Sequence, residues 1–181
     1  MKTNIKFAKT RPEAKIPSKR VEDAGFDLYA CFEEDYIRIG PHETKLIPTG
    51  IASACSSDYA LVLFERGSTG SKGMARRAGI VDSGFRNEIF VGLTNTTNRP
   101  LYISKLAKEE LFDVEYNAKS DVSFNDFVAE FENAIIYPYS KAIAQALVMP
   151  VPEVEVEEVS YEDLKAIPSE RGLGCLGSSS K

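Results

Sequence analysis

Residues 26–64 read FDLYACFEEDYIRIGPHETKLIPTGIASACSSDYALVLF. Short runs rich in β-branched and aromatic residues alternate here with glycine and proline, which is typical of antiparallel strands joined by turns. The pattern continues to about residue 106, and no βαβ alternation interrupts it. The sequence therefore predicts an all-β sandwich or barrel. The clearest predicted strands are Phe26–Phe32, Tyr36–Ile39, Thr44–Ile47, Tyr59–Phe64 and Glu88–Leu93.

Composition narrows the class of protein. The 181 residues fit one domain, and 43% hydrophobic residues are enough for a packed core. A net charge of −5 argues against a nucleic-acid binder, which needs a basic face. No apolar run reaches the roughly 18 residues of a membrane span, and the basic, proline-broken first twenty residues do not resemble a signal peptide. The three cysteines form no CxxC pair, so we expect a cytoplasmic protein without nucleic-acid or membrane partners.

The charge pattern changes after Leu106. Residues 107–136 contain eight acidic and two basic side chains. Apolar residues at helical spacing predict short helices near Leu111 and over Phe124–Phe131, the second one capped by Ser123 or Asn125. Two interpretations of this insertion stay open: a surface segment with a solvated acidic side, or a docking surface for another protein.

Two different segments follow the insertion. Residues 141–151 predict an apolar strand, and residues 153–159 alternate acid and valine, which predicts a second strand with one buried face. Residues 169–181 are rich in glycine and serine, which is typical of a flexible tail. We therefore predict a domain over residues 1–168 and a separate tail over residues 169–181.

Two segments combine arginine with glycine and hydroxyl residues: ERGSTGSKG at 65–73 and RGLGCLGSSS at 171–180. Small residues let backbone N–H groups approach an anion, and arginine can bind it through two parallel hydrogen bonds. Taken alone, the first segment also fits a polar hairpin connection and the second a disordered tail. Two such segments in an acidic protein indicate a local basic pocket for a polyanionic small molecule.

Three polar residues stand in apolar surroundings. Asp82 follows the apolar residues 79–81, so it is either a general base toward water or a turn residue bonded to nearby N–H groups. Asp27 needs a cationic partner, which Arg66 could supply. Gln145 either satisfies backbone groups or faces a ligand.

Five segments, in this order, resemble the motifs of the trimeric dUTP diphosphatase (dUTPase) family: AGFDLYA (24–30), RGSTGSKG (66–73), AGIVDSGFRNEI (78–89), KAIAQALV (141–148) and RGLGCLGSSS (171–180). The resemblance spans nearly the whole chain apart from the insertion, which is similar to that of some phage or Gram-positive members. It implies a dUTPase-like β-barrel or clip, a distorted jelly roll, with a small helical insertion. It also implies a homotrimer with active sites at subunit boundaries, where the tail of one chain closes as a lid over a site built by two others.

The resemblance further implies an activity and its residues. The reaction is hydrolysis of dUTP to dUMP and pyrophosphate by water attack on the α-phosphorus, which keeps uracil out of DNA and supplies dUMP for dTMP synthesis. Asp82 would activate the water, Asp27 would support Arg66, and Mg²⁺ would be held by the triphosphate and water without a protein metal site. The implied phosphate-binding residues are Arg66, Gly67, Ser68, Gln145, Arg171, Gly177, Ser178 and Ser179. The implied deoxyuridine-binding residues are Gly79, Ile80, Val81, Asp82, Phe85 and Leu176.

Several positions depart from the family's pattern. Phe85 replaces a tyrosine, Ala142 an arginine and Leu176 a phenylalanine, while Gly67 stands between Arg66 and its serine. The asparagine that often helps to read uracil has no clear equivalent.

Two alternative functions remain. A dCTP deaminase-type enzyme would need an acid in the strand after the third motif, and residues 90–95 (FVGLTN) contain none. A dUTPase-fold regulatory protein would bind a protein partner through residues 107–136. Hydrolysis of dUTP is the favoured prediction.

Overall fold

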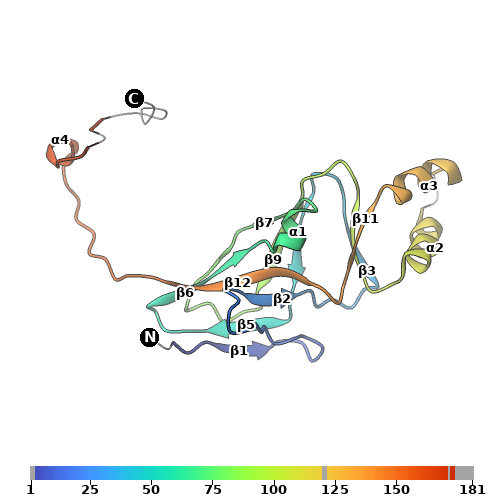
Figure 1. Cartoon of the computed structure of the whole chain (residues 1–181), viewed down its shortest axis with the longest axis horizontal. Coiled ribbons are helices and arrows are strands. Elements are labelled where there is room, and N and C mark those ends of the chain that lie inside the picture. The colour runs from blue at the N-terminus through green and yellow to red at the C-terminus, as the bar shows by residue number, and fades with distance from the viewer. Residues whose placement is uncertain (1–2, 120–121, 171, 174–181) are drawn as a thin grey trace. The chain divides into compact units, whose positions relative to one another are not determined.

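The computed structural model describes residues 3–119, 122–170 and 172–173. The chain divides into two compact units between Val151 and Pro152. The first unit is built mainly from short strands (Figure 1). The all-β prediction is therefore confirmed.

The strands of the first unit form four small sheets in the described part of the chain. All pairings are antiparallel except the parallel pair β10–β11. The first sheet pairs β1 (Lys6–Lys9) with β5 (Ile51–Ala54), and the second has the order β11 (Ile135–Pro138), β10 (Leu101–Ser104), β3 (Tyr36–Ile39). The third has the order β2 (Phe26–Tyr29), β12 (Ala142–Pro150), β6 (Tyr59–Phe64), β8 (Ile80–Val81), and the fourth β4 (Thr44–Pro48), β9 (Phe90–Asn95), β7 (Met74–Arg77).

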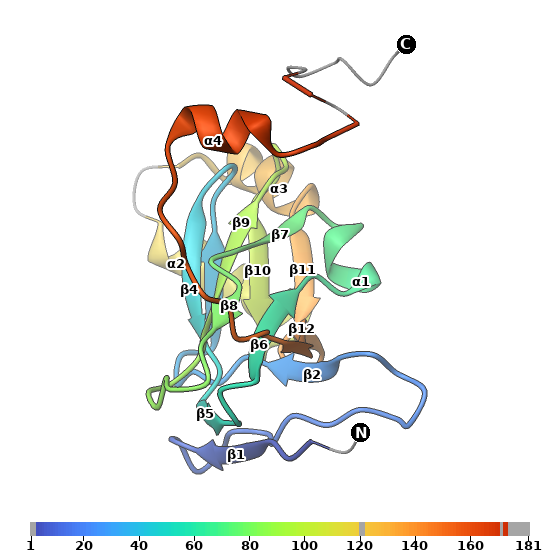
Figure 2. The ribbon, with the colours of Figure 1, turned by 90° about the vertical axis from the view of Figure 1, so that its left-hand side faces the viewer.

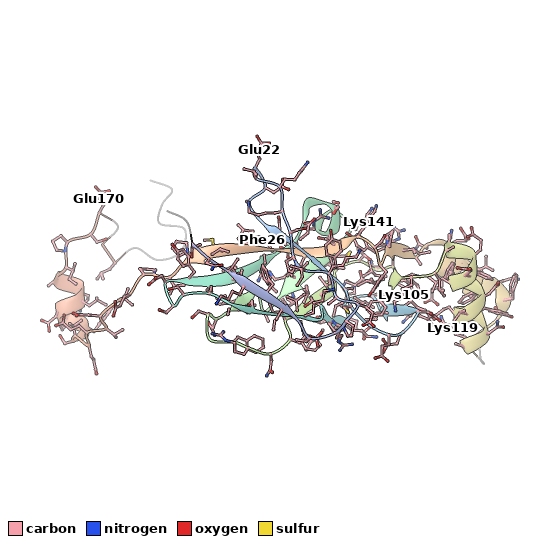
Figure 3. The ribbon with its side chains drawn as sticks, turned by 90° about the horizontal axis from the view of Figure 1, so that it is seen from below. Glu22, Phe26, Lys105, Lys119, Lys141 and Glu170 are labelled. Carbon is pink, nitrogen blue, oxygen red and sulfur yellow. The ribbon has the colours of Figure 1, made fainter. Side chains whose placement is uncertain are left out.

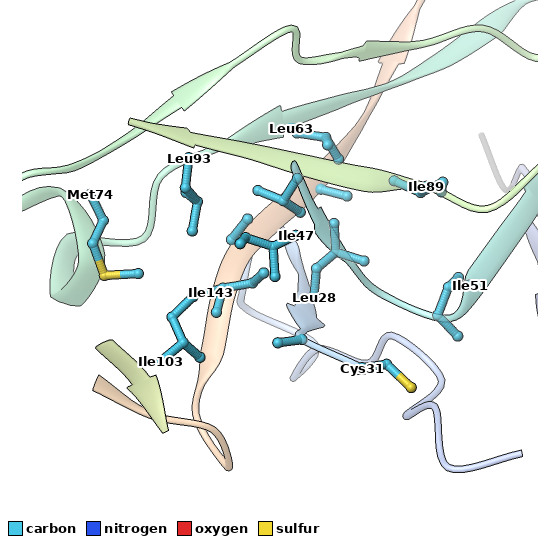
Figure 4. Packing of buried hydrophobic residues seen from close by; sticks show 14 of the residues in the cluster. Leu28, Cys31, Ile47, Ile51, Leu63, Met74, Ile89, Leu93, Ile103 and Ile143 are labelled. Atoms are coloured by element: carbon cyan, nitrogen blue, oxygen red, sulfur yellow. The ribbon is translucent and has the colours of Figure 1, made fainter. Parts of the chain in front are cut away.

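One apolar core joins these sheets (Figure 4). Ile47 of β4, Ile103 of β10 and Ile143 of β12 come from three different sheets, and all three are fully buried. Burial of apolar surface stabilises a fold by about 25 cal/mol per Å². The shared core therefore fixes the strands from which the polar loops extend.

The insertion forms two helices, α2 (Lys108–Ala118) and α3 (Phe124–Glu132), as its spacing predicts (Figure 2). The hydroxyl of Ser123 accepts a hydrogen bond from the amide of Asp126, so Ser123 and not Asn125 caps α3. The apolar faces of both helices pack with Tyr102 of β10 into a second buried cluster. None of the helices in the described residues is long and apolar enough to cross a membrane.

The acidic side of the insertion is not wholly solvated, because Glu115 of α2 is only 5% exposed. Its carboxylate accepts hydrogen bonds from the hydroxyls of Tyr36 and Tyr102, the latter at 3.0 Å. The guanidinium of Arg38 lies 3.6 Å from the same carboxylate. Because Tyr36 and Arg38 belong to β3 and Tyr102 to β10, this network fastens α2 to the second sheet.

The prediction of a second strand at residues 153–159 is wrong. The structure describes all of these residues, gives them no strand and leaves every one exposed. Val154 and Val156 are 71% and 93% exposed. A strand needs a neighbour to pair its backbone groups, and no ladder among the described residues includes this segment. A short helix that the sequence analysis did not predict, α4 (Tyr161–Ala166), follows after Ser160, which caps it.

Candidate active site

The predicted anion-binding segment forms α1 (Gly67–Gly70), a single helical turn between β6 and β7. Thr69 holds the turn together, since its buried hydroxyl accepts from the Arg66 amide at 2.9 Å and donates to the Arg66 carbonyl at 3.0 Å. The first amides of a helix have no acceptor within the helix, and those of Gly67 and Ser68 belong to this group. The turn can therefore offer backbone N–H groups as well as the Arg66 side chain.

Glu65 fixes the turn from the side of β7. Its carboxylate accepts a hydrogen bond from the Arg76 amide at 2.7 Å. Burial alone raises the pKa of Glu65, but this hydrogen bond and the charges of Arg76 and Arg77 outweigh burial, so the pKa lies below its ordinary value. The carboxylate stays ionised at neutral pH and keeps α1 attached to β7.

Arg66 pairs with Asp27 of β2 through both ends of the guanidinium. Arg66 Nε lies 2.8 Å from Asp27 Oδ1, and Nη2 donates to Oδ2 at 3.3 Å. The side chains are 31% and 30% exposed, so one face of the pair can still reach a ligand. Arg66 Nη1 also donates to the hydroxyl of Ser68 at 3.3 Å. The pair therefore orients the guanidinium beside the α1 turn.

Gln145 lies between these elements because β12 pairs with both neighbours. It stands opposite Asp27 in β2 and opposite Phe64 in β6. Its amide donates to the Glu65 carbonyl at 2.8 Å, which is the backbone-satisfying role considered from the sequence. A Cβ at Gly25 would come within 2.8 Å of Gln145 Oε1, so glycine leaves room for this side chain.

These groups line an open pocket of about 730 Å³. Asp27, Arg66, Gly67, Ser68 and Gln145, which the sequence places in three separate segments, meet there. We call this the anion pocket. Its arginine, hydroxyl and backbone amides suit the oxygens of phosphate groups.

Asp82 lines a second, smaller pocket of about 220 Å³ together with Ile80, Val81 and Phe85. We call it the hairpin pocket. The Phe85 amide donates to the Asp82 carbonyl at 3.0 Å and closes a turn. The Asp82 carboxylate is exposed and has no hydrogen bond or ion pair within the described residues. It does not bond to the turn's backbone, which leaves it free to contact water.

The hairpin that carries Asp82 begins with an unusual backbone. Ala78 has a φ of 48°, in the left-handed region that favours glycine. The next residue, Gly79, accepts a hydrogen bond from the Leu63 amide at 2.6 Å, and a Cβ there would overlap the guanidinium of Arg76. Left-handed backbone of a non-glycine residue is concentrated at functional sites.

The predicted site residues thus fall into three groups. The first group lines the anion pocket and the second lines the hairpin pocket, and the two pockets share no residue. Gly79 is buried beside the second group. The third group, Arg171, Leu176, Gly177, Ser178 and Ser179, lies outside the described residues.

One wall of the anion pocket consists of residues that were not predicted from the sequence. Ser18, Lys19, Arg20 and Asp23 line it from the loop that precedes β2. The signal available was a pair of adjacent basic residues a few positions before Asp27. In a basic N-terminal segment, such a pair is not distinctive.

An all-β chain with a phosphate-compatible pocket and an unpaired carboxylate in a second pocket has the features of a protein that acts on a polyanionic small molecule. The dUTPase family model matches residues 12–108. The "Deoxyuridine 5'-triphosphate nucleotidohydrolase" of Nautilia profundicola is 31% identical, over 98% of this chain and 99% of that protein. The protein of the same name from Mycolicibacterium gilvum is 32% identical over 58% of this chain and 70% of its own length. The chain therefore belongs to the dUTPase family.

Solved structures support the fold. The dUTPase of Staphylococcus bacteriophage 80alpha, determined with dUPNHPP, superposes with a TM-score of 0.68 at 18% identity, covering 98% of this chain and 99% of that one. The native EIAV dUTPase superposes with a TM-score of 0.58 at 20% identity, covering 87% and 98%. The fold is dUTPase-like, as the motifs predict.

Proposed function

We propose that this protein is a dUTP diphosphatase that hydrolyses dUTP to dUMP and pyrophosphate. The observation that carries this function is the match to the Nautilia profundicola nucleotidohydrolase over 98% of the chain, because a match of that extent includes both pockets. The reaction removes dUTP, a source of uracil in DNA, and supplies dUMP. The cytoplasm is the proposed location, because three cysteines, an odd number without a CxxC pair, suit a reducing compartment.

In this proposal, the hairpin pocket activates water and binds the deoxyuridine, and the anion pocket binds the phosphates. The Asp82 carboxylate accepts a proton from a water molecule as the water oxygen attacks the α-phosphorus. A new bond from water to phosphorus forms, and the bond from the α-phosphorus to the bridging oxygen breaks, so pyrophosphate leaves with the bonding electrons. Arg66, the hydroxyl of Ser68 and the first amides of α1 stabilise the negative charge of the phosphates. Phe85 packs against the deoxyribose, and the backbone of residues 79–82 reads the base.

The proposed cofactor is Mg²⁺. The described residues contain no cluster of three or more histidine, cysteine, aspartate or glutamate side chains that could hold a metal. Oxygen ligands from the phosphates and from water suit this ion. Asp27 is proposed to support Arg66, with which it is paired, and not to bind the metal. When bound, Mg²⁺ would neutralise charge on the phosphates.

A homotrimer with shared sites is the proposed assembly. Because Asp82 and Arg66 line different pockets of one chain, a site that needs both can be completed by a second copy. Residues 169–181, with Arg171, Leu176, Gly177, Ser178 and Ser179, are the proposed lid.

Substitution of Asp82 tests the reaction. In Asp82→Asn, we expect turnover to fall by about a hundredfold or more, while an unreactive imido analogue of dUTP binds within a few-fold of the unmodified protein. Pyrophosphate release and calorimetric titration measure the two quantities. Asp113→Asn, an exposed carboxylate on α2, is the matched control. Near-normal turnover in Asp82→Asn would remove Asp82 from this role, and ammonia release from dCTP would favour a deaminase.

A second candidate function is binding of a protein partner at the insertion. It is favoured by apolar side chains that α2 and α3 leave uncovered, since Val114 and Phe124 are 42% and 54% exposed. Replacing both by serine should abolish capture of such a partner without changing dUTP hydrolysis. Unchanged capture by the double variant would exclude this surface.

A further inference from the structure

The loop that precedes β2 forms one wall of the anion pocket. Ser18 and Asp27 form an isolated β-bridge, in which the Asp27 amide donates to the Ser18 carbonyl at 2.9 Å. This bridge holds the two ends of the loop next to each other. Figure 3 shows Glu22 at the tip of the loop, away from the sheets, and Phe26 at its base. In Figures 2 and 3, α1 projects from the same side of the sheets as this loop. Two segments far apart in sequence therefore face the same pocket.

Carboxylates neutralise two of the three cations that line the pocket in the described residues. Arg66 is paired with Asp27, as described above. Arg20 is paired with Asp23, with 3.0 Å between Nε and Oδ2 and 3.1 Å between Nη2 and Oδ1. Both carboxylates of the pocket are thus already engaged by arginines.

Lys19 is the third cation, and no ion pair among the described residues includes it. Its ammonium donates to the carbonyl of Asp23 at 2.6 Å and to that of Arg20 at 3.3 Å, and it lies 5.8 Å from the ring of Phe26. Carbonyl groups and a ring hold the ammonium in place but carry no net negative charge. An ammonium has three N–H donors, so at least one remains for a ligand.

The division of the substrate between the two pockets indicates which part reaches Lys19. Asp82 has to face the α-phosphorus, and it lines the hairpin pocket with Phe85. The part of the triphosphate farthest from the base therefore extends into the anion pocket, where Lys19 lies. A net positive charge attracts the β- and γ-phosphates, which carry most of the negative charge.

We propose that Lys19 is a substrate-binding residue that contacts the β- and γ-phosphates of dUTP, the part released as pyrophosphate. This inference rests on the proposed function for the identity of the nucleotide. The loop of residues 18–23 acts as a preformed arm that holds the ammonium over the pocket, and the Arg20–Asp23 pair keeps the arm folded.

Binding of pyrophosphate and of dUMP separates this role from a structural one. In Lys19→Ala, we expect the dissociation constant for magnesium pyrophosphate to rise about tenfold, the loss typical of a hydrogen bond to a charged group. Binding of dUMP should stay within about twofold, because dUMP lacks those phosphates. Lys19→Arg should restore most of the affinity by keeping the charge. Lys15→Ala is the control, since Lys15 lies over the ring of Tyr29 and does not line the pocket.

Steady-state kinetics give a second readout. A contact made equally in the ground and transition states changes KM and leaves kcat alone, so Lys19→Ala should raise the KM for dUTP with kcat within about twofold. Equal weakening of pyrophosphate and dUMP, or no weakening of either, would overturn the proposal. If the unmodified protein does not hydrolyse dUTP, the proposed function fails, while the pyrophosphate comparison still decides whether Lys19 binds phosphate.

Discussion

At the scale of single residues, Ala78 joins the third-motif hairpin to the sheet that carries Arg76 and Arg77. Its left-handed backbone costs an L-residue about 1–2 kcal/mol, and a glycine would avoid that cost. The strained backbone directs residues 79–82 along β6, where Gly79 accepts from Leu63. The hairpin that holds Asp82 is therefore retained at some expense to stability.

Replacing Ala78 by glycine tests this strain. We expect Ala78→Gly to leave the free energy of unfolding unchanged or to raise it by up to about 1 kcal/mol, because relief of strain offsets the extra freedom of the unfolded chain. Ala8→Gly is the matched control, since Ala8 is an exposed alanine inside β1 and should lose about 0.5–1 kcal/mol. Urea unfolding measures both. Equal losses in the two variants would show that Ala78 is not strained.

Part of the site could be predicted at this scale, and part could not. Asp27, Arg66 and Gln145 stand out as polar residues beside glycine or within apolar runs, and each lines the anion pocket. Lys19 gives no such signal, because its role depends on which carboxylates its neighbours engage. The positive φ of Ala78 has no sequence signal, since alanine rarely adopts it.

At the scale of elements, the contact between α2 and the second sheet depends on protonated tyrosines. Burial, the hydrogen bond to Glu115 and the charge of Glu115 raise the pKa of Tyr36 to about 12. Burial likewise raises the pKa of Tyr102. Both tyrosine hydroxyls donate a hydrogen bond to the Glu115 carboxylate. A tyrosine that has lost its hydroxyl proton can no longer donate this bond.

This network predicts a loss of stability at high pH. A tyrosine whose folded pKa exceeds its ordinary value of about 10 contributes stability fully below that value and loses it as pH rises toward about 12. Tyr36→Phe should lower the free energy of unfolding by about 1 kcal/mol near pH 8. Between pH 8 and pH 11, the free energy of unfolding should then fall less in Tyr36→Phe than in the unmodified protein. Tyr161→Phe, an exposed tyrosine of α4, is the control. A decline in Tyr36→Phe as steep as in the unmodified protein would contradict this prediction.

The elements differ in how far their sequence determines them. The spacing of apolar residues over Phe124–Phe131 predicts α3, because the same residues that show the period also form its buried face. The alternation over residues 153–159 does not predict a strand reliably. Alternation of polar and apolar residues indicates only that one face of a strand could be buried. A strand also needs a neighbouring strand to pair its backbone groups, and the described residues of this chain provide none at residues 153–159.

At the scale of the whole molecule, the placement of Arg66 and Asp82 in two separate pockets bears on how copies of the chain assemble. The motifs predict that Asp82 and Arg66 serve one reaction, but a single sequence does not say whether one chain brings them together. In this chain they line pockets with no common residue. A site that uses both therefore draws on two copies if the proposed homotrimer is correct.

Mixed assembly of two inactive variants tests this. Asp82→Asn and Arg66→Ala should each be nearly inactive alone, because each removes one half of every site. When the two are co-assembled in equal amounts, a site is intact if its Asp82 comes from an Arg66→Ala chain and its Arg66 from an Asp82→Asn chain. Random assembly makes about one quarter of the sites intact, so pyrophosphate release should return to about a quarter of the normal rate.

The control for this experiment co-assembles Asp82→Asn with Asp82→Ala, which can form no intact site and should stay inactive. Recovery in the first mixture alone means that the two pockets meet across a subunit boundary. If both mixtures stay inactive although size analysis shows that mixed oligomers form, Asp82 and Arg66 act from the same chain. The shared-site assembly would then be wrong, while the assignment of each residue to catalysis would stand on its own variant.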